Sequence, residues 1–156
     1  MTVLHAKDIE RIACAMEENG EKFYRAWAAK TADSNINKIL LELADEEKKH
    51  METFRTFFSD ISPLSVIEEE AGAYMNFFNS YTENLVFKTS AAEIPEDRLR
   101  ISVSVLEYAV AKEYDSIAYY NEIKNFVRAD NQHIISRVID EERTHIVKLV
   151  DIIQTL

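Results

Sequence analysis

The sequence predicts an all-α protein, a four-helix bundle with one long connection between the second and third helices, and three observations favour this fold. The 156 residues include only two glycines and two prolines, which favours long helices over short strands joined by tight turns. Four segments place apolar residues at the spacing of an amphipathic helix. These four segments are joined by three connections, and only one of the three is long. The length suits a single domain over residues 1–156.

The first two helices are expected over residues 8–30 and 34–58. Their apolar faces comprise Ile9, Ala13, Met16, Gly20, Phe23 and Trp27 in the first, and Ile36, Leu40, Leu43, Met51, Phe54 and Phe57 or Phe58 in the second. The loop between them, near residues 32–35, is short. A short loop joins antiparallel neighbours, so these helices are expected to pack side by side.

The last two helices are expected within residues 95–127 and from about residue 130 to the end, so that residues 95–156 form a second pair. Their apolar faces comprise Leu106, Ala109, Val110, Ile117, Tyr120 and Ile123, and then Ile135, Val138, Ile146, Leu149 and Ile153. Pro95 suits a first helical turn, where its missing N–H costs nothing. The loop near residues 128–131 is again short, which predicts a second antiparallel pair.

The connection over residues 59–94 is too apolar to be a polar linker. It contains Val66, Ile67, Tyr74, Met75, Phe77, Phe78, Tyr81, Leu85, Val86 and Phe87, which all need to be buried. We expect a partly helical crossover that packs on the bundle or at a dimer interface. One long crossover distinguishes this arrangement from a simple up-down-up-down bundle.

Charge and composition exclude several classes of partner. The net charge is −10 and Lys and Arg do not cluster, so we expect no nucleic acid partner. No apolar run approaches the roughly 20 residues of a membrane span, and the N-terminal residues lack the apolar region of a signal peptide. Cys14 is the one cysteine, which rules out an internal disulfide and a cysteine-based metal site. A cytoplasmic location is expected.

Charged residues interrupt the apolar faces in all four helices. Glu47 and His50 continue the apolar series of the second helix, and Glu142 and His145 continue that of the fourth. Glu17 lies between Ala13 and Gly20, and Glu113 lies between Val110 and Ile117. A carboxylate that faces a core costs several kcal/mol unless it is paired, ligated or protonated. Four inward glutamates and two histidines therefore predict a shared cation.

An internal repeat supports this interpretation. An offset of 96 residues aligns Ala13, Glu17, Gly20, Phe23 and Tyr24 with Ala109, Glu113, Ser116, Tyr119 and Tyr120, and an offset of 95 aligns Asp45-Glu46-Glu47 and His50 with Asp140-Glu141-Glu142 and His145. Each half thus supplies one core glutamate and one Glu-x-x-His, in which both side chains lie on one helix face. Two such halves form the carboxylate-rich site that binds two metals in bundle cores.

These motifs resemble the rubrerythrin-like di-iron proteins of the ferritin-like superfamily, and the resemblance covers nearly the whole chain. It is carried by Met16-Glu17-Glu18-Asn19-Gly20, by Leu43-Ala44-Asp45-Glu46-Glu47 with His50, by Glu113 with Asp115-Ser116, and by Asp140-Glu141-Glu142 with His145. The resemblance implies a ferritin-like bundle in which Glu47 and Glu142 bridge two iron ions. It also implies that Glu17 and Glu113 are terminal ligands and that His50 and His145 bind one ion each.

The sequence departs from peroxidase-type members of that family at two points. They carry a rubredoxin module with a four-cysteine iron site, whereas this sequence has Cys14 alone. Their pattern also includes a seventh ligand, an additional glutamate, at the position where this sequence has Ser116. Both differences concern peroxidase activity and leave the six metal ligands in place.

Residues around the six expected ligands have less specific patterns. Tyr24 and Tyr120 each follow a core glutamate by seven residues, so we expect their phenols to hydrogen-bond carboxylate ligands or donate an electron. The adjacent acids Glu18, Glu46 and Glu141 lie about 100° from the apolar faces and are expected to be solvated. Further expectations are a buried Cys14, surface His5 and His133, and Trp27 in the core or an interface.

Three functions fit this sequence. The first is a di-iron oxidoreductase that reacts with hydrogen peroxide or dioxygen in oxidative-stress defence, with electrons from a separate rubredoxin-like protein or flavin reductase. The second is a ferroxidase that handles iron as ferritins do, and the third is a bundle that binds metal without catalysis. Two iron ions are the expected cofactor, with manganese or zinc as alternatives. We expect a homodimer.

Overall fold

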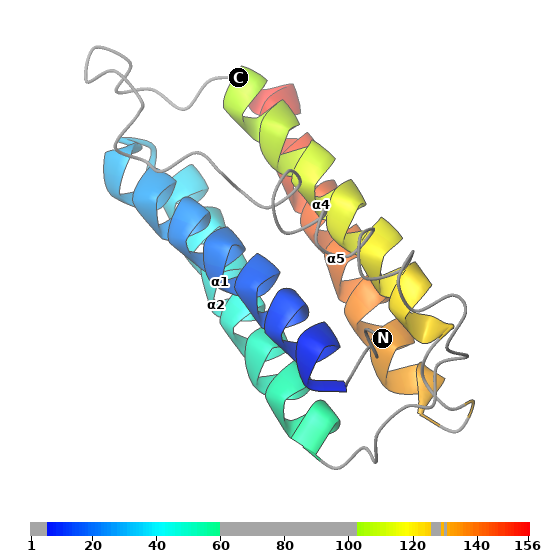
Figure 1. Cartoon of the computed structure of the whole chain (residues 1–156). Helices are drawn as coiled ribbons and strands as arrows, with labels where there is room; N and C mark the ends of the chain where they lie inside the picture. The colour runs from blue at the N-terminus through cyan, green and yellow to red at the C-terminus, as the bar shows by residue number, and fades with distance from the viewer. Residues whose placement is uncertain (1–5, 60–102, 126–128, 130) are drawn as a thin grey trace.

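The computed structural model describes residues 6–59, 103–125, 129 and 131–156. They form four helices, α1 (Ala6–Lys30), α2 (Ser34–Ser59), α4 (Val103–Lys124) and α5 (Gln132–Thr155), drawn in Figure 1. No strand occurs within these ranges. The predicted all-α four-helix bundle is therefore confirmed.

The helix bounds agree with the sequence patterns, and local chemistry accounts for one of them. The carboxylate of Asp33 accepts hydrogen bonds from the backbone N–H of Asn35 at 2.8 Å and of Ile36 at 3.0 Å, which caps the start of α2. The last helix begins at Gln132, slightly later than the sequence suggested. The expected first turn at Pro95 and the crossover over residues 59–94 lie outside the described residues, apart from Ser59.

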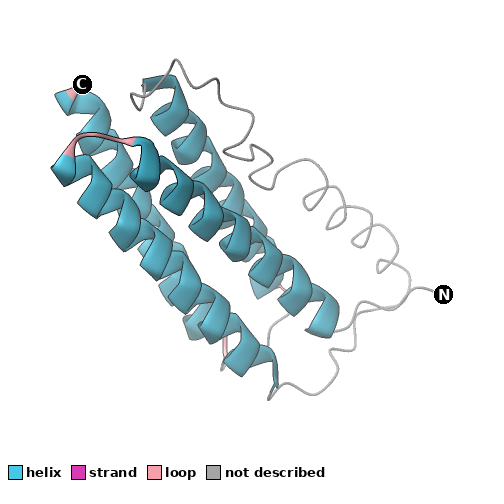
Figure 2. Ribbon diagram, turned by 90° about the vertical axis from the view of Figure 1, so that its left-hand side faces the viewer, coloured by secondary structure: helices cyan, strands magenta, loops and turns pink. Residues whose placement is uncertain are grey.

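The helices form two hairpins, α1 with α2 and α4 with α5, which pack against each other (Figure 2). The early part of α1 and the late part of α2 share one apolar cluster with the late part of α4 and the early part of α5. It follows that α2 ends and α4 begins at opposite ends of the bundle. Such an arrangement needs one connection that runs the length of the bundle, as in ferritin-like folds.

Two apolar clusters fill the bundle and leave a polar layer between them. One comprises Ile9, Ile12, Ala13, Met16, Phe54, Phe57, Phe58, Tyr119, Tyr120, Ile123, Ile135, Val138 and Ile139. The other comprises Phe23, Tyr24, Trp27, Ala28, Ile36, Leu40, Leu43, Ala44, Leu106, Ala109, Leu149 and Ile152. The layer between them contains the six charged residues singled out in the sequence, so the packing that stabilises the fold also excludes water from this layer.

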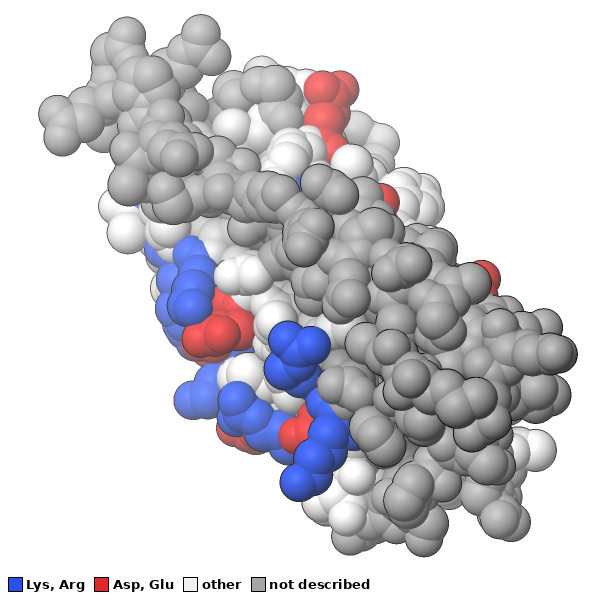
Figure 3. Space-filling view, viewed as in Figure 1, with Lys and Arg blue, Asp and Glu red and all other residues white. Residues whose placement is uncertain are grey.

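Charged side chains of both signs lie together on the outer surface. Figure 3 shows Lys and Arg beside Asp and Glu over α1 and α2. Arg25, for example, contacts Glu21 on its own helix and Asp45 on α2, both at 2.8 Å. Such exposed pairs stabilise a helix weakly. None of the helices described is long and apolar enough to span a membrane.

Candidate metal centre

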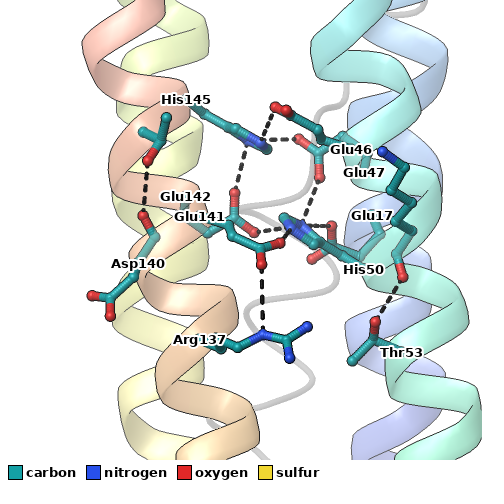
Figure 4. A network of polar contacts seen from close by, with 12 residues as sticks. Glu17, Glu46, Glu47, His50, Thr53, Arg137, Asp140, Glu141, Glu142 and His145 are labelled. Atoms are coloured by element: carbon teal, nitrogen blue, oxygen red, sulfur yellow. Dashed lines mark hydrogen bonds and ion pairs between the residues drawn. The ribbon is translucent and has the colours of Figure 1, made fainter.

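The polar layer brings together all six residues that interrupt the apolar faces. Glu17 comes from α1, Glu47 and His50 from α2, Glu113 from α4, and Glu142 and His145 from α5; each is at least 97% buried. Figure 4 labels five of them among the polar contacts between the two hairpins: Glu17, Glu47, His50, Glu142 and His145. Four glutamates and two imidazoles thus meet in a space with almost no access to water.

The six side chains form two groups of potential ligands that share two members. Glu17 and His50 form one group with Glu47 and Glu142, and Glu113 with His145 forms a second group with the same two shared glutamates. Within each group, one ligand atom from every residue lies within 4.8 Å of the others. The shared positions of Glu47 and Glu142 are what a pair of adjacent cations with two bridging carboxylates requires.

Each histidine turns its Nδ1 atom toward the glutamates. In His50, Nδ1 lies 3.2 Å from Glu17 Oε2 and 3.2 Å from Glu142 Oε1. In His145, Nδ1 lies 3.0 Å from Glu142 Oε2 and 3.6 Å from Glu113 Oε1. A neutral imidazole binds a metal through one ring nitrogen. Nδ1 is therefore the nitrogen available to a cation in this layer.

The opposite ring nitrogens contact two acids that the sequence analysis assigned to solvent. His50 Nε2 hydrogen-bonds Glu141 Oε2 at 2.8 Å, and His145 Nε2 lies 3.1 Å from Glu46 Oε2. Glu141 is exposed, as predicted, with 48% of its side chain accessible, whereas Glu46 is half-buried at 34%. The sequence did not predict that each also reaches across to the histidine of the other hairpin. Glu18, in contrast, is exposed and pairs with Lys22 at 2.8 Å.

These outer carboxylates contact the imidazoles on the side opposite Nδ1, and Glu141 does so through a hydrogen bond to His50. A carboxylate that accepts the Nε2 hydrogen fixes the tautomer, leaves Nδ1 free to bind a metal and raises its basicity. The doubled Asp-Glu-Glu-x-x-His motif contained the signal for this role, since the middle glutamate recurs in both halves. Helix periodicity alone places that residue off the buried face.

The two tyrosines each hydrogen-bond a glutamate in the other half of the internal repeat. The Tyr24 hydroxyl donates a hydrogen bond to Glu113, and the Tyr120 hydroxyl donates one to Glu17. Both tyrosines are fully buried. Burial, reinforced by the charge of Glu113, raises the pKa of Tyr24 well above its usual range. The phenol therefore remains protonated and available as a donor to the carboxylate.

The glutamates divide into two kinds when no cation is present. Burial, together with the charges of Glu47 and Glu142, raises the pKa of Glu17 and the pKa of Glu113 well above the usual range. Burial also opposes ionisation of Glu47, but hydrogen bonds with Glu17 and the imidazoles hold its pKa below the usual range. The pKa of Glu142 is likewise lowered by the imidazoles, despite burial and the nearby charge of Glu47.

The histidines take the charge that balances the two ionised glutamates. Burial alone would favour neutral imidazoles, but the carboxylates around them raise the pKa of His50, chiefly through Glu142. The pKa of His145 rises for the same reason, chiefly through Glu113 and Glu142. Without metal, these shifts favour ionised Glu47 and Glu142 beside protonated imidazoles, an arrangement in which the charges of the layer cancel.

This arrangement leaves buried ligand atoms that a cation would satisfy. Neither oxygen of Glu142 and neither ring nitrogen of His145 has a partner in hydrogen-bonding geometry, although the ion-pair distances between them are short. Buried polar atoms are normally hydrogen-bonded. Their misalignment, in a layer rich in carboxylate oxygens, indicates that the residues present fit a pair of metal ions.

Gly20 provides space for one of the shared carboxylates. A Cβ atom at this position would lie 3.0 Å from Cδ and 3.1 Å from Oε1 of Glu47. We expect Gly20→Ala to displace the Glu47 carboxylate and to weaken metal binding at least about tenfold, a loss typical of disturbed ligand support. Equilibrium dialysis with Co²⁺ measures the change.

Ser116 supplies the matched control, because the internal repeat aligns it with Gly20 and it already carries a Cβ atom. It is buried at 8% exposure. Ser116→Ala should leave metal affinity within about threefold of wild type. Equal affinities for wild type and Gly20→Ala would contradict the role given to Gly20.

The remaining residues of interest lie away from the centre. Cys14 is half-buried, with its Sγ atom 3.7 Å from the Met51 carbonyl oxygen, and burial raises the pKa of its thiol. Trp27 is buried in the core, and His133 is exposed, whereas His5 lies outside the described residues.

Comparison with known proteins agrees with this geometry. The model of the rubrerythrin family matches residues 9–99, which include Glu17, Glu47 and His50. A crystal structure of a Thermotoga maritima protein, described as ferritin-like and diiron-carboxylate, is similar to this one with a TM-score of 0.72 and 28% identity. That match covers 99% of this chain and 97% of the other.

A second similar protein is known from Pyrococcus furiosus. It is a ferritin-like-encapsulin shell fusion protein and is 34% identical over 65 residues. The matched segment makes up 42% of this chain and 19% of the fusion protein. The likeness therefore concerns less than a fifth of that protein.

Proposed function

The chain belongs to the rubrerythrin family, and from that premise we propose that it is a non-haem di-iron oxidoreductase. Its substrate would be hydrogen peroxide or dioxygen, and its electrons would come from a separate protein. The observation that carries this proposal is the pair of ligand groups that share Glu47 and Glu142. Two adjacent metal positions with common carboxylates suit a reaction in which two metals act on one small molecule.

The donor set favours iron. Carboxylate oxygens with one imidazole per position suit iron or manganese, and zinc also binds such sites by affinity alone. Four ionised glutamates would balance two divalent ions, so that the loaded layer would be neutral. The diiron-carboxylate description of the similar Thermotoga maritima protein supports iron over the alternatives. Two iron ions, when bound, supply the electrons and the Lewis acidity for cleaving an O–O bond.

The chain's own residues would control water and protons around that reaction. The apolar clusters on either side exclude solvent from the layer. The hydroxyls of Tyr24 and Tyr120 donate hydrogen bonds to Glu113 and Glu17 respectively, which would fix the orientation of the two terminal carboxylates. Glu141 would hold the His50 ring by a hydrogen bond so that Nδ1 faces the metals, and Glu46 lies beside the corresponding nitrogen of His145.

An external reductant is part of the proposal. Cys14 is the one cysteine among the 156 residues, so these residues contain no four-cysteine iron site that could supply electrons. A rubredoxin-like protein or a flavin reductase is the class of donor that fits. The peroxide-reducing cycle consumes electrons and protons in equal number, and the donor has to provide the electrons.

Iron-loaded protein tests this proposal. We expect near-ultraviolet absorption from the oxidised centre that dithionite bleaches and that peroxide or air restores, because two redox-active ions share bridging carboxylates. Glu142→Ala is the matched control and should lose the signal. Peroxide consumption should begin when an electron carrier and its reductase are added. Reduced iron-loaded protein that remains unchanged by both oxidants would refute the redox function.

The resemblance to the Pyrococcus furiosus fusion protein supports a second candidate function, the oxidation of ferrous iron for storage. Its name combines a ferritin-like part with an encapsulin shell. Iron handling of this kind would show as many iron atoms per chain after aerobic loading. The redox enzyme should stop at about two per chain, and we expect it to behave as a homodimer in solution.

A further inference from the structure

The two halves of the candidate centre differ in the charge that surrounds their outer glutamates. Glu141 supports His50 through a hydrogen bond of 2.8 Å, and Glu46 lies 3.1 Å from the corresponding nitrogen of His145. The second contact is outside hydrogen-bonding geometry, since His145 Nε2 has no aligned partner. The internal repeat would make the two contacts equivalent, so the cause of the difference should be a position at which the two halves carry different residues.

Lys148 is the residue that differs. Its Nζ atom donates to both carboxylate oxygens of Glu46, at 2.7 and 3.0 Å, and its side chain is 26% exposed. Within the described residues, Glu141 also pairs with Arg137, whose Nε atom lies 3.8 Å from Glu141 Oε1 and whose side chain is 78% exposed. Water screens an exposed pair strongly. Glu46 is therefore neutralised by a close ammonium group, whereas Glu141 keeps most of its negative charge.

Comparison of the two halves of the repeat shows that Lys148 adds a positive charge to one half only. Lys148 follows His145 by three residues, and the residue that follows His50 by three is Thr53. The Thr53 hydroxyl donates to the backbone carbonyl of Lys49 at 2.9 Å and contributes no charge (Figure 4). Removing the charge with Lys148→Thr, or adding one to the other half with Thr53→Lys, should therefore reduce the difference in charge between the two halves.

We infer that Lys148 makes the two metal positions unequal, so that a divalent ion binds beside Glu17 and His50 before a second binds beside Glu113 and His145. This inference rests on the proposed two-metal centre. Lys148 acts as a positioning residue, because it contacts Glu46 and none of the six candidate ligands. Two effects combine: the ammonium charge repels a nearby cation, and a neutralised Glu46 polarises His145 less than Glu141 polarises His50.

Stepwise titration of metal-free protein with Co²⁺, followed by calorimetry, tests the inference. Wild type should bind two ions with dissociation constants at least about tenfold apart, the range over which outer carboxylates tune metal sites. Lys148→Thr should reduce that separation to within about threefold by strengthening the weaker step, and Thr53→Lys should weaken the tighter one. Lys148→Arg, which keeps the charge, should preserve the wild-type separation.

Two further variants assign the steps. His50→Ala should remove the tighter step, and His145→Ala should remove the weaker one. Two bound ions with the same separation in wild type, Lys148→Thr and Thr53→Lys would overturn this inference and leave the proposed function standing. A wild-type chain that binds fewer than two ions would overturn both. Thermal melts of the metal-free variants check that each one is folded.

Discussion

Replacing Glu47 with alanine is expected to remove both metal ions from the chain, because both ligand groups include this residue. The same holds for Glu142→Ala. Loss of a supporting residue outside the ligand set typically weakens metal affinity 10–100-fold, so loss of a shared ligand should cost more than about 100-fold at each position. Inductively coupled plasma analysis of protein dialysed against limiting metal gives the occupancy directly.

Glu17→Ala and Glu113→Ala are the matched controls for that result. Each belongs to one ligand group only, and each is as buried as the shared glutamates. Both variants should therefore retain about one ion per chain, at the position that keeps its full ligand group. If all four alanine variants lost metal to the same extent, the distinction between shared and terminal glutamates would be wrong.

Loading the protein with two divalent ions is expected to release protons from Glu17, Glu113, His50 and His145. Burial raises the pKa of the two glutamates, and the surrounding carboxylates raise the pKa of the two imidazoles, so all four groups bind protons more tightly in the metal-free fold. Metal ligation requires the deprotonated forms. Calorimetry in buffers of different ionisation enthalpy counts the protons, and affinity should rise steeply with pH.

The same pKa shifts set the pH dependence of the metal-free fold. Glu17 and Glu113 have pKa values raised above the ordinary 4.5, so the folded chain holds protons that the unfolded chain releases as pH rises past that value. His50 and His145 do the same above the ordinary 6.5. The free energy of unfolding should therefore fall as pH rises through each of these values.

At low pH the free energy of unfolding should change with pH in the opposite direction. Glu47 and Glu142 have pKa values below the ordinary 4.5, so their contribution is present above that value and is lost as pH falls. Metal-free protein should thus be most stable in mildly acid solution. Denaturant melts at several pH values measure this. Loading that releases no protons, or metal-free stability that keeps rising from pH 5 to 8, would contradict the directions of these pKa shifts.

Most of the fold and of the metal centre could be predicted from the sequence because helical periodicity is a local property. Glu17, Glu47, Glu113 and Glu142 continue apolar series, and a residue in such a series faces the core whatever the neighbouring helix is. The internal repeat added the expectation that two similar halves meet. Their common burial in one layer follows from these two facts alone.

The sequence could not predict contacts that depend on how the two hairpins face each other. Glu46 and Glu141 lie off the buried face of their own helices, and solvent was the natural expectation for them. Each nevertheless reaches a histidine on the opposite hairpin, about as far away in the sequence as the two halves are from each other. Periodicity within one helix carries no information on such contacts. The effect of Lys148 on one half alone was hidden for the same reason.

The central claim is that the chain binds two iron ions among these six residues. Anomalous X-ray diffraction at the iron edge from iron-loaded crystals tests this claim most directly. The account predicts two iron peaks in each chain, one beside Glu17 and His50 and one beside Glu113 and His145, with Glu47 and Glu142 contacting both. A single peak, or peaks that lie away from these six residues, would contradict it.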